Sequence, residues 1–137
     1  MTYLLDTSVV AELRKGSRAN PHLRAWFAAL APDAIVLSVL TIGEVRRGIE
    51  RVRRRDPAAA KALDRWLRRL LVDHGDRIVG IDRQVAEEWG RLNVPDPLPV
   101  IDGLLAATAT VHGLVLATRN VGDVARSGAE VVNPFEA

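Results

Sequence analysis

Short apolar runs alternate along the chain with longer stretches in which apolar residues recur every three or four positions. The short runs are typical of buried strands, and the longer stretches are typical of amphipathic helices. Because helical stretches separate successive strands, the pattern predicts an α/β fold with a central parallel sheet, built as one domain over residues 1–137. The predicted strands cover residues 3–5, 35–37, 77–81, 114–117 and, as a short fifth strand, 130–132.

Capping residues and prolines mark where the helices begin. Asn20 and Asp56 each precede a proline, and a capping side chain followed by proline is typical of a helix start. Asp82 is expected to cap a further helix, and Gly113 is expected to end the last long one. The predicted helices begin near residues 8, 21, 41, 57, 83 and 100.

The amino-acid composition excludes several classes of protein. Hydrophobic residues make up 48% of the 137 positions and charged residues 26%, which is ordinary globular usage. The lack of cysteine excludes a disulfide scaffold, a thiolate zinc site and a cysteine nucleophile. No apolar run approaches the roughly 20 residues of a membrane span, and no leader pattern precedes the first strand. We therefore expect an unprocessed cytoplasmic protein without a membrane partner.

Arginine dominates the positive charge. Lys15 and Lys61 are the only lysines among 19 basic residues, so the other 17 are arginines. Six of these arginines lie within residues 46–55, where Glu50 is the only acid. Arginine binds phosphate bidentately, so this block suits a nucleic-acid backbone or an acidic protein partner. A solvated helix face is the alternative interpretation, and charge alone leaves both open.

Acidic side chains gather where predicted strands end. Asp6 directly follows the first strand and Asp82 the third, while a polar stretch at 118–123 follows the fourth. The carboxyl ends of parallel strands meet at one edge of a sheet, where ligands bind. Glu44 and Asp102 lie in the early turns of otherwise apolar helices. Each is either part of a charged site or an ordinary helix residue, stabilised by the helix dipole at Asp102 and by a salt bridge at Glu44.

The clustered carboxylates predict a hard metal ion. Oxygen ligands without cysteine suit Mg²⁺ or Mn²⁺, and His22, His74 and His112 show no metal-ligand spacing. The chain also lacks the glycine-rich motifs of P-loop and dinucleotide-binding proteins. Acids beside an arginine-rich helix favour metal-assisted hydrolysis of a phosphodiester.

Four motifs occur in order along nearly the whole chain: LLDTS at 4–8, SxxTxxExxxG at 38–48, DxxxAATA at 102–109 and TRNxxD at 118–123. With the closing NPF at 133–135, they resemble the PIN-domain ribonucleases and, more narrowly, the VapC toxins, including the FitB-like branch. The resemblance implies a PIN-domain α/β/α sandwich with a central parallel sheet. It also implies a toxin that is a Mg²⁺-dependent endoribonuclease, with Mn²⁺ as a substitute, acting on structured RNA such as tRNA or rRNA.

The resemblance further implies roles for individual acids. Asp6, Glu44 and Asp102 match the acidic triad of the family, with Asp6 and Asp102 as the principal metal ligands and Glu44 completing the shell. The fourth position is ambiguous, because Asn120 stands where some members have an acid and Asp123 lies three residues further on. Asn120 offers a carbonyl oxygen without charge, and Asp123 either reaches the metal or caps the next helix.

Supporting and RNA-binding residues complete the expected site. The hydroxyls of Ser8 and Thr118 are expected to orient a ligand or to support the loop. Arg46, Arg47 and Arg119 are candidates for binding the phosphates that flank the scissile bond.

The resemblance also implies the partners of the chain. They are a VapB-type antitoxin whose C-terminal segment covers the groove, a second copy in a homodimer, and operator DNA that is reached only through the antitoxin. The helices around residues 23–30 and 63–71 are the expected contact surfaces, with plain core packing as the alternative.

Other interpretations compete with a nuclease. An aspartate-based phosphatase of the haloacid-dehalogenase type needs a second acid where Ser8 stands. A receiver domain needs a lysine after a late strand, which neither Lys15 nor Lys61 supplies. A non-catalytic RNA- or protein-binding PIN module is the remaining alternative, and the acidic triad argues against it.

Overall fold

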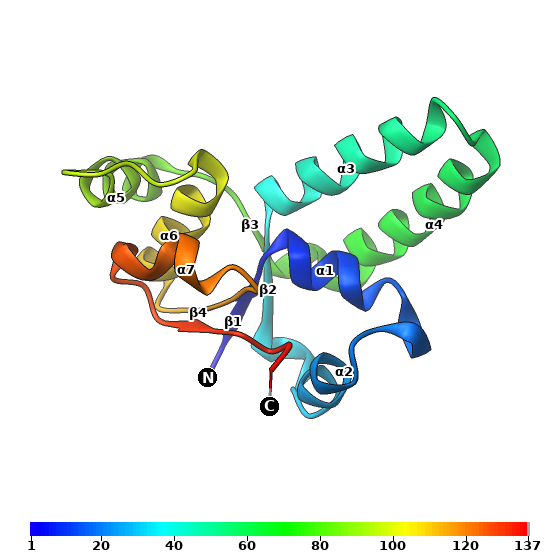
Figure 1. Cartoon of the computed structure of the whole chain (residues 1–137), viewed down its shortest axis with the longest axis horizontal. Coiled ribbons are helices and arrows are strands. Elements are labelled where there is room, and N and C mark those ends of the chain that lie inside the picture. The colour runs from blue at the N-terminus through cyan, green and yellow to red at the C-terminus, as the bar shows by residue number, and fades with distance from the viewer. Residues whose placement is uncertain (137) are drawn as a thin grey trace.

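Five strands form one parallel sheet at the centre of the molecule (Figure 1). The structure is a computed structural model that describes residues 1–136. The strands are β1 (Tyr3–Leu5), β2 (Ile35–Ser38), β3 (Ile78–Val79), β4 (Val115–Ala117) and β5 (Val131–Val132). Their order in the sheet is β3-β2-β1-β4-β5, so β1 and β4 are neighbours although more than a hundred residues separate them. The parallel sheet predicted from the alternating pattern is confirmed.

Side-chain caps begin the helices at the residues that the sequence indicates. Asn20, Asp56 and Asp82 each accept a hydrogen bond from the backbone N–H three residues later, and Gly113 ends a helix with a φ of 65°. None of the helices in the described part of the chain is both long and apolar enough to cross a membrane. The helices are α1 (Thr7–Leu13), α2 (Pro21–Ala28), α3 (Val39–Arg53), α4 (Pro57–His74), α5 (Arg83–Leu92), α6 (Val100–His112) and α7 (Val121–Val124).

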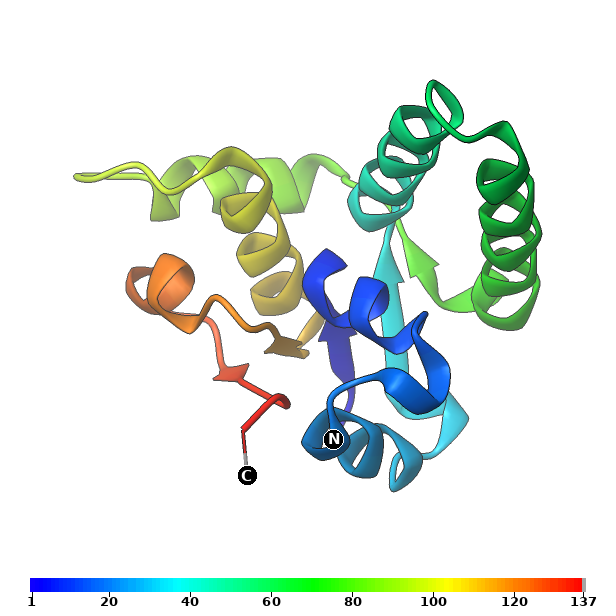
Figure 2. The same ribbon diagram turned by 45° about the vertical axis from the view of Figure 1, so that its right-hand side comes forward.

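Layers of helices cover both faces of the sheet (Figure 2), and successive side chains of β1 enter two different cores. On one face, Leu5 of β1 packs in a core with Val9 of α1 and Leu67 of α4. On the other face, Leu4 packs with Leu105 of α6. Helices α1 to α4 therefore cover one face, and α6 and α7 cover the other, with α5 packed on α6. This arrangement confirms the α/β/α sandwich.

Strands β2, β4 and β5 each differ by one residue from the predicted ranges, and three further differences have a physical reason. Helix α3 begins at Val39 rather than near residue 41, because the buried hydroxyl of Ser38 accepts a hydrogen bond from Leu40 N. Strand β3 is shorter than 77–81, since its partner β2 ends at Ser38 and offers no further register positions. Helix α7 was not predicted, because four residues are too few to show a helical period.

Helices α3 and α4 form a hairpin that projects beyond the sheet (Figure 1). Its inner side is apolar and includes Ile49 and Leu67. On its polar side, Asp64 of α4 accepts hydrogen bonds from Arg46 at 2.8 Å and from Arg53 at 2.8 and 2.9 Å. Glu50 also accepts hydrogen bonds from both arginines. The hydrogen bonds from Arg46 and Arg53 lower the pKa of Asp64 and connect α3 to α4.

Replacing Leu4 by alanine is expected to destabilise the fold by about 2–5 kcal/mol, because this fully buried side chain would leave a cavity beneath α6. Urea unfolding at neutral pH measures the change. Val72→Ala is the matched control, because Val72 is 78% exposed on α4 and should change stability by less than about 0.5 kcal/mol. If the two variants lost the same free energy of unfolding, the assignment of Leu4 to the core would be contradicted.

Candidate active site

Asp6 is a buried carboxylate at the junction of three elements. It follows β1, caps α1 and is only 5% exposed. Its Oδ1 accepts hydrogen bonds from Val9 N at 3.0 Å and from the Ser8 hydroxyl at 2.6 Å, while its Oδ2 accepts one from the Thr118 hydroxyl. Both oxygens therefore have fixed positions, and the carboxylate cannot rotate without breaking these bonds.

The loop after β4 supplies Thr118 and its neighbours. Because Ala117 lies opposite Leu5 in the sheet, the residue after β4 stands beside the residue after β1. The Thr118 hydroxyl also accepts a hydrogen bond from Asn120 N at 2.9 Å. Asn120 precedes α7, and its side chain forms no capping hydrogen bond with that helix. The register of two central strands thus places Thr118 against Asp6.

Glu44 reaches the same region from α3. Its carboxylate accepts a hydrogen bond from the hydroxyl of Thr7, the residue directly after Asp6. Thr7 is a site residue to which the sequence analysis assigned no role, although it belongs to the LLDTS motif. The signal available in the sequence was its place beside a strand-terminal aspartate, but its partner is 37 residues away in the chain.

Asp102 and Asp123 complete a set of four carboxylates. Asp102 lies in the first turn of α6, and Asp123 lies in α7. Burial raises the pKa of Asp102, and the negative charges of Asp123, Asp6 and Glu44 raise it further. The other three acids named from the sequence therefore all act electrostatically on Asp102. Asp82 stays apart as the cap of α5.

The donor set suits a hard divalent cation that keeps part of its water shell. Within residues 1–136, no three acidic or histidine side chains are already grouped closely enough to hold an ion. Carboxylate oxygens are nevertheless the preferred ligands of Mg²⁺, which is usually bound by one or two carboxylates together with waters. Mutual repulsion of the acids is relieved when a cation binds between them. The residues thus fit a partly hydrated ion rather than a preformed protein cage.

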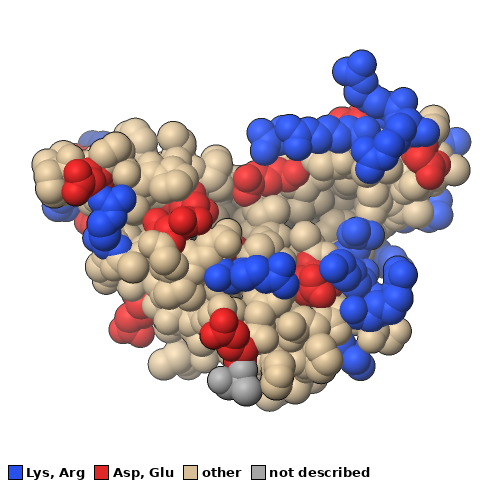
Figure 3. Space-filling view, viewed as in Figure 1, with Lys and Arg blue, Asp and Glu red and all other residues tan. Residues whose placement is uncertain are grey.

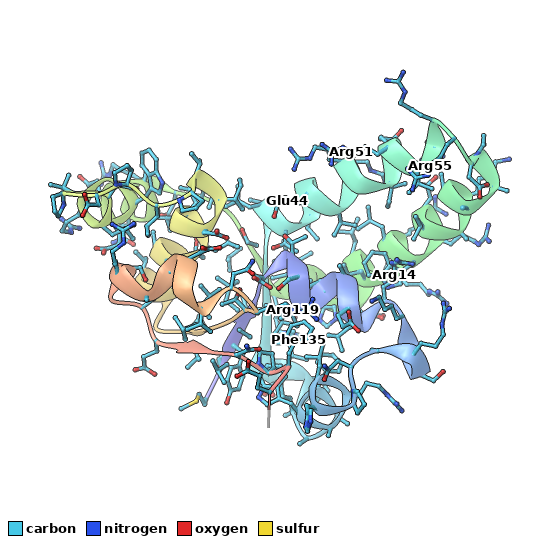
Figure 4. All side chains as sticks on the ribbon, viewed as in Figure 1. Arg14, Glu44, Arg51, Arg55, Arg119 and Phe135 are labelled. Atoms are coloured by element: carbon cyan, nitrogen blue, oxygen red, sulfur yellow. The ribbon has the colours of Figure 1, made fainter. Side chains whose placement is uncertain are left out.

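The three candidate arginines have different surroundings. Arg46 is bound to Asp64 and Glu50, whereas Arg47 is exposed and forms no ion pair among residues 1–136. The guanidinium carbon of Arg119 lies 3.8 Å from the ring centroid of Phe135, in the closing NPF motif. Its Nη2 lies 3.9 Å from a Glu12 carboxylate oxygen. Arg119, which directly follows Thr118 in the loop after β4, is thus held against Phe135 (Figure 4).

A hollow of about 260 Å³ adjoins the acids between α1, α3 and α4. Thr7 and Glu44 line it on the side of the acids, and Arg14 lines it at the end of α1. Figure 3 shows this face hollowed below α3, with basic side chains on both sides of the depression. The lining residues are Thr7, Ala11, Arg14, Glu44, Val45, Gly48, Ile49, Leu63 and Trp66.

Comparisons with known proteins agree with the fold. The VapC ribonuclease Y4jK of Sinorhizobium fredii (strain NBRC 101917 / NGR234) is 28% identical over 141 residues, which cover 97% of each chain. The crystal structure of FitAcB from Neisseria gonorrhoeae matches with a TM-score of 0.91 at 27% identity, covering 99% of this chain and 100% of that one. A toxin–antitoxin complex from Klebsiella pneumoniae matches with a TM-score of 0.75 at 27% identity, with the same coverage.

The resemblance read from the four motifs is confirmed at the level of the family. The model that describes the PIN domain matches residues 3–124, which include all five proposed acidic and amide site positions from Asp6 to Asp123. Because that match spans most of the sequence, the chain belongs to the PIN domain family.

Proposed function

We propose that the chain is the toxin of a type II toxin–antitoxin pair and acts as a metal-dependent endoribonuclease. The observation that supports the proposal most is that the charges of Asp6, Glu44 and Asp123 all raise the pKa of Asp102 at the carboxyl edge of a PIN-domain sheet. The similarity to a VapC ribonuclease and to a toxin–antitoxin complex supports it. The proposed substrate is structured RNA, with tRNA or rRNA as the expected class, and the activity belongs to the cytoplasm, where this RNA is found.

Asp6 and Asp102 are the proposed direct ligands of Mg²⁺ or Mn²⁺. A divalent ion in such a site polarises the scissile phosphate and activates water for in-line attack. When an ion is bound, Glu44 and Asp123 would add negative charge around it and could accept hydrogen bonds from its water ligands. The hydroxyls of Ser8 and Thr118 hold the Asp6 carboxylate in one orientation, and Thr7 does the same for Glu44.

The proposed protein partner is a VapB-type antitoxin that covers the groove beside the acids. The similar structures from Neisseria gonorrhoeae and Klebsiella pneumoniae support this, because the second is described as a toxin–antitoxin complex. A homodimer and contact with operator DNA through the antitoxin remain part of the proposal.

Asp6→Asn is expected to abolish RNA cleavage, because asparagine keeps the shape that caps α1 but removes the charge that binds the ion. The purified chain should cut total RNA or tRNA into discrete fragments with Mg²⁺ or Mn²⁺, and EDTA should stop the reaction. The matched control is Asp33→Asn, an exposed aspartate away from the acids, which should retain full activity.

Two outcomes of this assay would contradict the proposal. Cleavage that survives Asp6→Asn would exclude the proposed site and would indicate a contaminating nuclease. If the folded wild-type chain, free of any partner, neither cuts RNA nor gains thermal stability from divalent ions, the non-catalytic binding module becomes the better interpretation.

The repulsion at Asp102 predicts how stability depends on pH. Because its pKa is raised in the folded chain, the ionised form is less favourable there than in the unfolded chain. The stability of the metal-free protein should therefore fall as pH rises from the ordinary aspartate range through the raised pKa. Asp102→Asn lacks this titration, so in EDTA at pH 7 the variant should melt at a higher temperature than wild type, and the difference should shrink toward pH 4.

Thermal unfolding with and without Mg²⁺ or Mn²⁺ measures both effects. The ion should raise the melting temperature of wild type and have little effect on Asp102→Asn, since only the charged site binds it. Asp33→Asn again serves as the control and should follow wild type throughout. If Asp102→Asn melted below wild type in EDTA at pH 7, the carboxylate would have a stabilising partner, contrary to the interpretation above.

A further inference from the structure

The hollow beside the acids combines features that recognise a nucleotide. Its walls are largely apolar, with Val45, Ile49 and Leu63 among the lining residues and Trp66 presenting an aromatic side chain. Trp66 is only half-buried, so part of its surface is available to a ligand. A volume of about 260 Å³ lies just below that of typical small-molecule pockets and suits a group the size of one base.

Positive charge lies at the edge of this apolar hollow. Arg14 lines it directly, is exposed, and forms no ion pair within residues 1–136. Arg51 follows Glu44 by seven residues, which keeps it close to the same side of α3, and Arg55 lies in the turn after that helix. Figure 4 shows Arg51 on α3, Arg55 near the turn that leads to α4, and Arg14 at the end of α1. The rim therefore suits an anion, while the interior suits an apolar ring.

The arginines at this rim differ from those that stabilise the hairpin. Arg46 and Arg53 share the carboxylates of Asp64 and Glu50, so their charge is largely neutralised. Arg51 and Arg55 have no such partner in the described chain and are exposed. Among residues 1–136, Arg14 thus brings an unpaired positive charge to the hollow itself, and Arg51 and Arg55 add two more on the neighbouring hairpin.

We propose that the hollow between α1, α3 and α4 receives one unpaired base of the RNA substrate, next to the phosphate that is cut. Trp66 stacks on the base, and Arg14 binds an adjacent phosphate. The inference rests on the proposed nuclease function, because Thr7 and Glu44 line the hollow and also belong to the site of cleavage. Single-stranded RNA is commonly recognised by stacking its bases on aromatic side chains while arginines bind its backbone.

The test distinguishes binding of an RNA base from binding of the RNA backbone. A labelled RNA octamer of random sequence and an abasic octamer of the same length are titrated with the full chain in Mg²⁺, and anisotropy gives the two dissociation constants. Every protein carries Asp6→Asn so that no RNA is cut. Trp66→Leu, which keeps an apolar side chain but removes the aromatic face, should weaken binding of the random octamer at least fivefold. Its binding of the abasic octamer should not change.

Two further tryptophan variants control for folding. Trp66→Phe should restore most of the lost affinity, since phenylalanine also offers a face for stacking. Trp26→Leu removes a half-buried tryptophan of α2 that packs edge-to-face on Tyr3 at 4.9 Å and does not line the hollow. This variant should bind both octamers like the parent while losing thermal stability.

Arginine variants test the rim. Arg14→Gln should weaken binding of both octamers equally and reduce the slope of affinity against salt by about 0.7, the value for one phosphate contact on a single strand. Arg69→Gln is the control, because Arg69 is exposed on α4 and belongs to a different depression. If Arg14→Gln and Arg69→Gln changed the RNA affinity equally, Arg14 at the edge of the hollow would have no specific role in binding phosphate.

The remaining outcomes each overturn the inference. If Trp66→Leu weakens the binding of both octamers equally, or the binding of neither, no base enters the hollow. An apolar side chain of a protein partner then becomes the better occupant. If Trp66→Leu instead changes the molecular mass in solution, the hollow is an interface between two copies. Failure of the proposed function is recognised separately, because the wild-type chain would then cut no RNA whatever the octamers show.

Discussion

A single buried carboxylate connects the main parts of this molecule. Asp6 follows the central strand β1 and caps α1 by accepting a hydrogen bond from Val9 N. It also accepts a hydrogen bond from the hydroxyl of Thr118, in the loop after the neighbouring strand β4. These bonds place two distant segments of the chain side by side and keep a negative charge out of bulk water. Such a charge is tolerated in the fold because each of its oxygens is hydrogen-bonded. The same bonds fix the direction in which the carboxylate faces a cation, so one group serves both the fold and the proposed chemistry.

Asp102, in contrast, opposes folding in the absence of a cation. Burial and three neighbouring negative charges raise the pKa of Asp102, which means that the metal-free site contains unrelieved repulsion. A protein under selection for stability alone would replace such a residue with a neutral one. Its presence at the start of an otherwise apolar helix is therefore best explained by a ligand that compensates the charge. Functional sites commonly retain unfavourable electrostatics of this kind.

Charge is organised differently on the hairpin of α3 and α4. Asp64 and Glu50 neutralise Arg46 and Arg53, and these bonds connect the two helices along their polar side. Arg51 and Arg55 form no ion pair in the described chain, although they belong to the same stretch of sequence. Paired and unpaired arginines are thus interleaved within ten residues. The positions of Glu50 and of Asp64, which lies on the next helix, separate the two groups.

The sequence by itself determined the elements and the acids. Alternating apolar runs and capping residues such as Asn20 and Asp82 act locally, so they predicted the parallel α/β sheet and most helix starts. The order and spacing of the motifs indicated the family and named Asp6, Glu44, Asp102 and Asp123. Tertiary structure alone decided which residues meet. The register of β1 against β4 places Thr118 on Asp6, and the approach of α3 to α1 places Glu44 on Thr7. Helix packing also pairs Arg46 with Asp64 and brings Arg14 and Trp66 to one hollow. The sequence could not predict these contacts, because contacts between distant segments depend on how the helices pack on the sheet and leave no periodic signal in the chain.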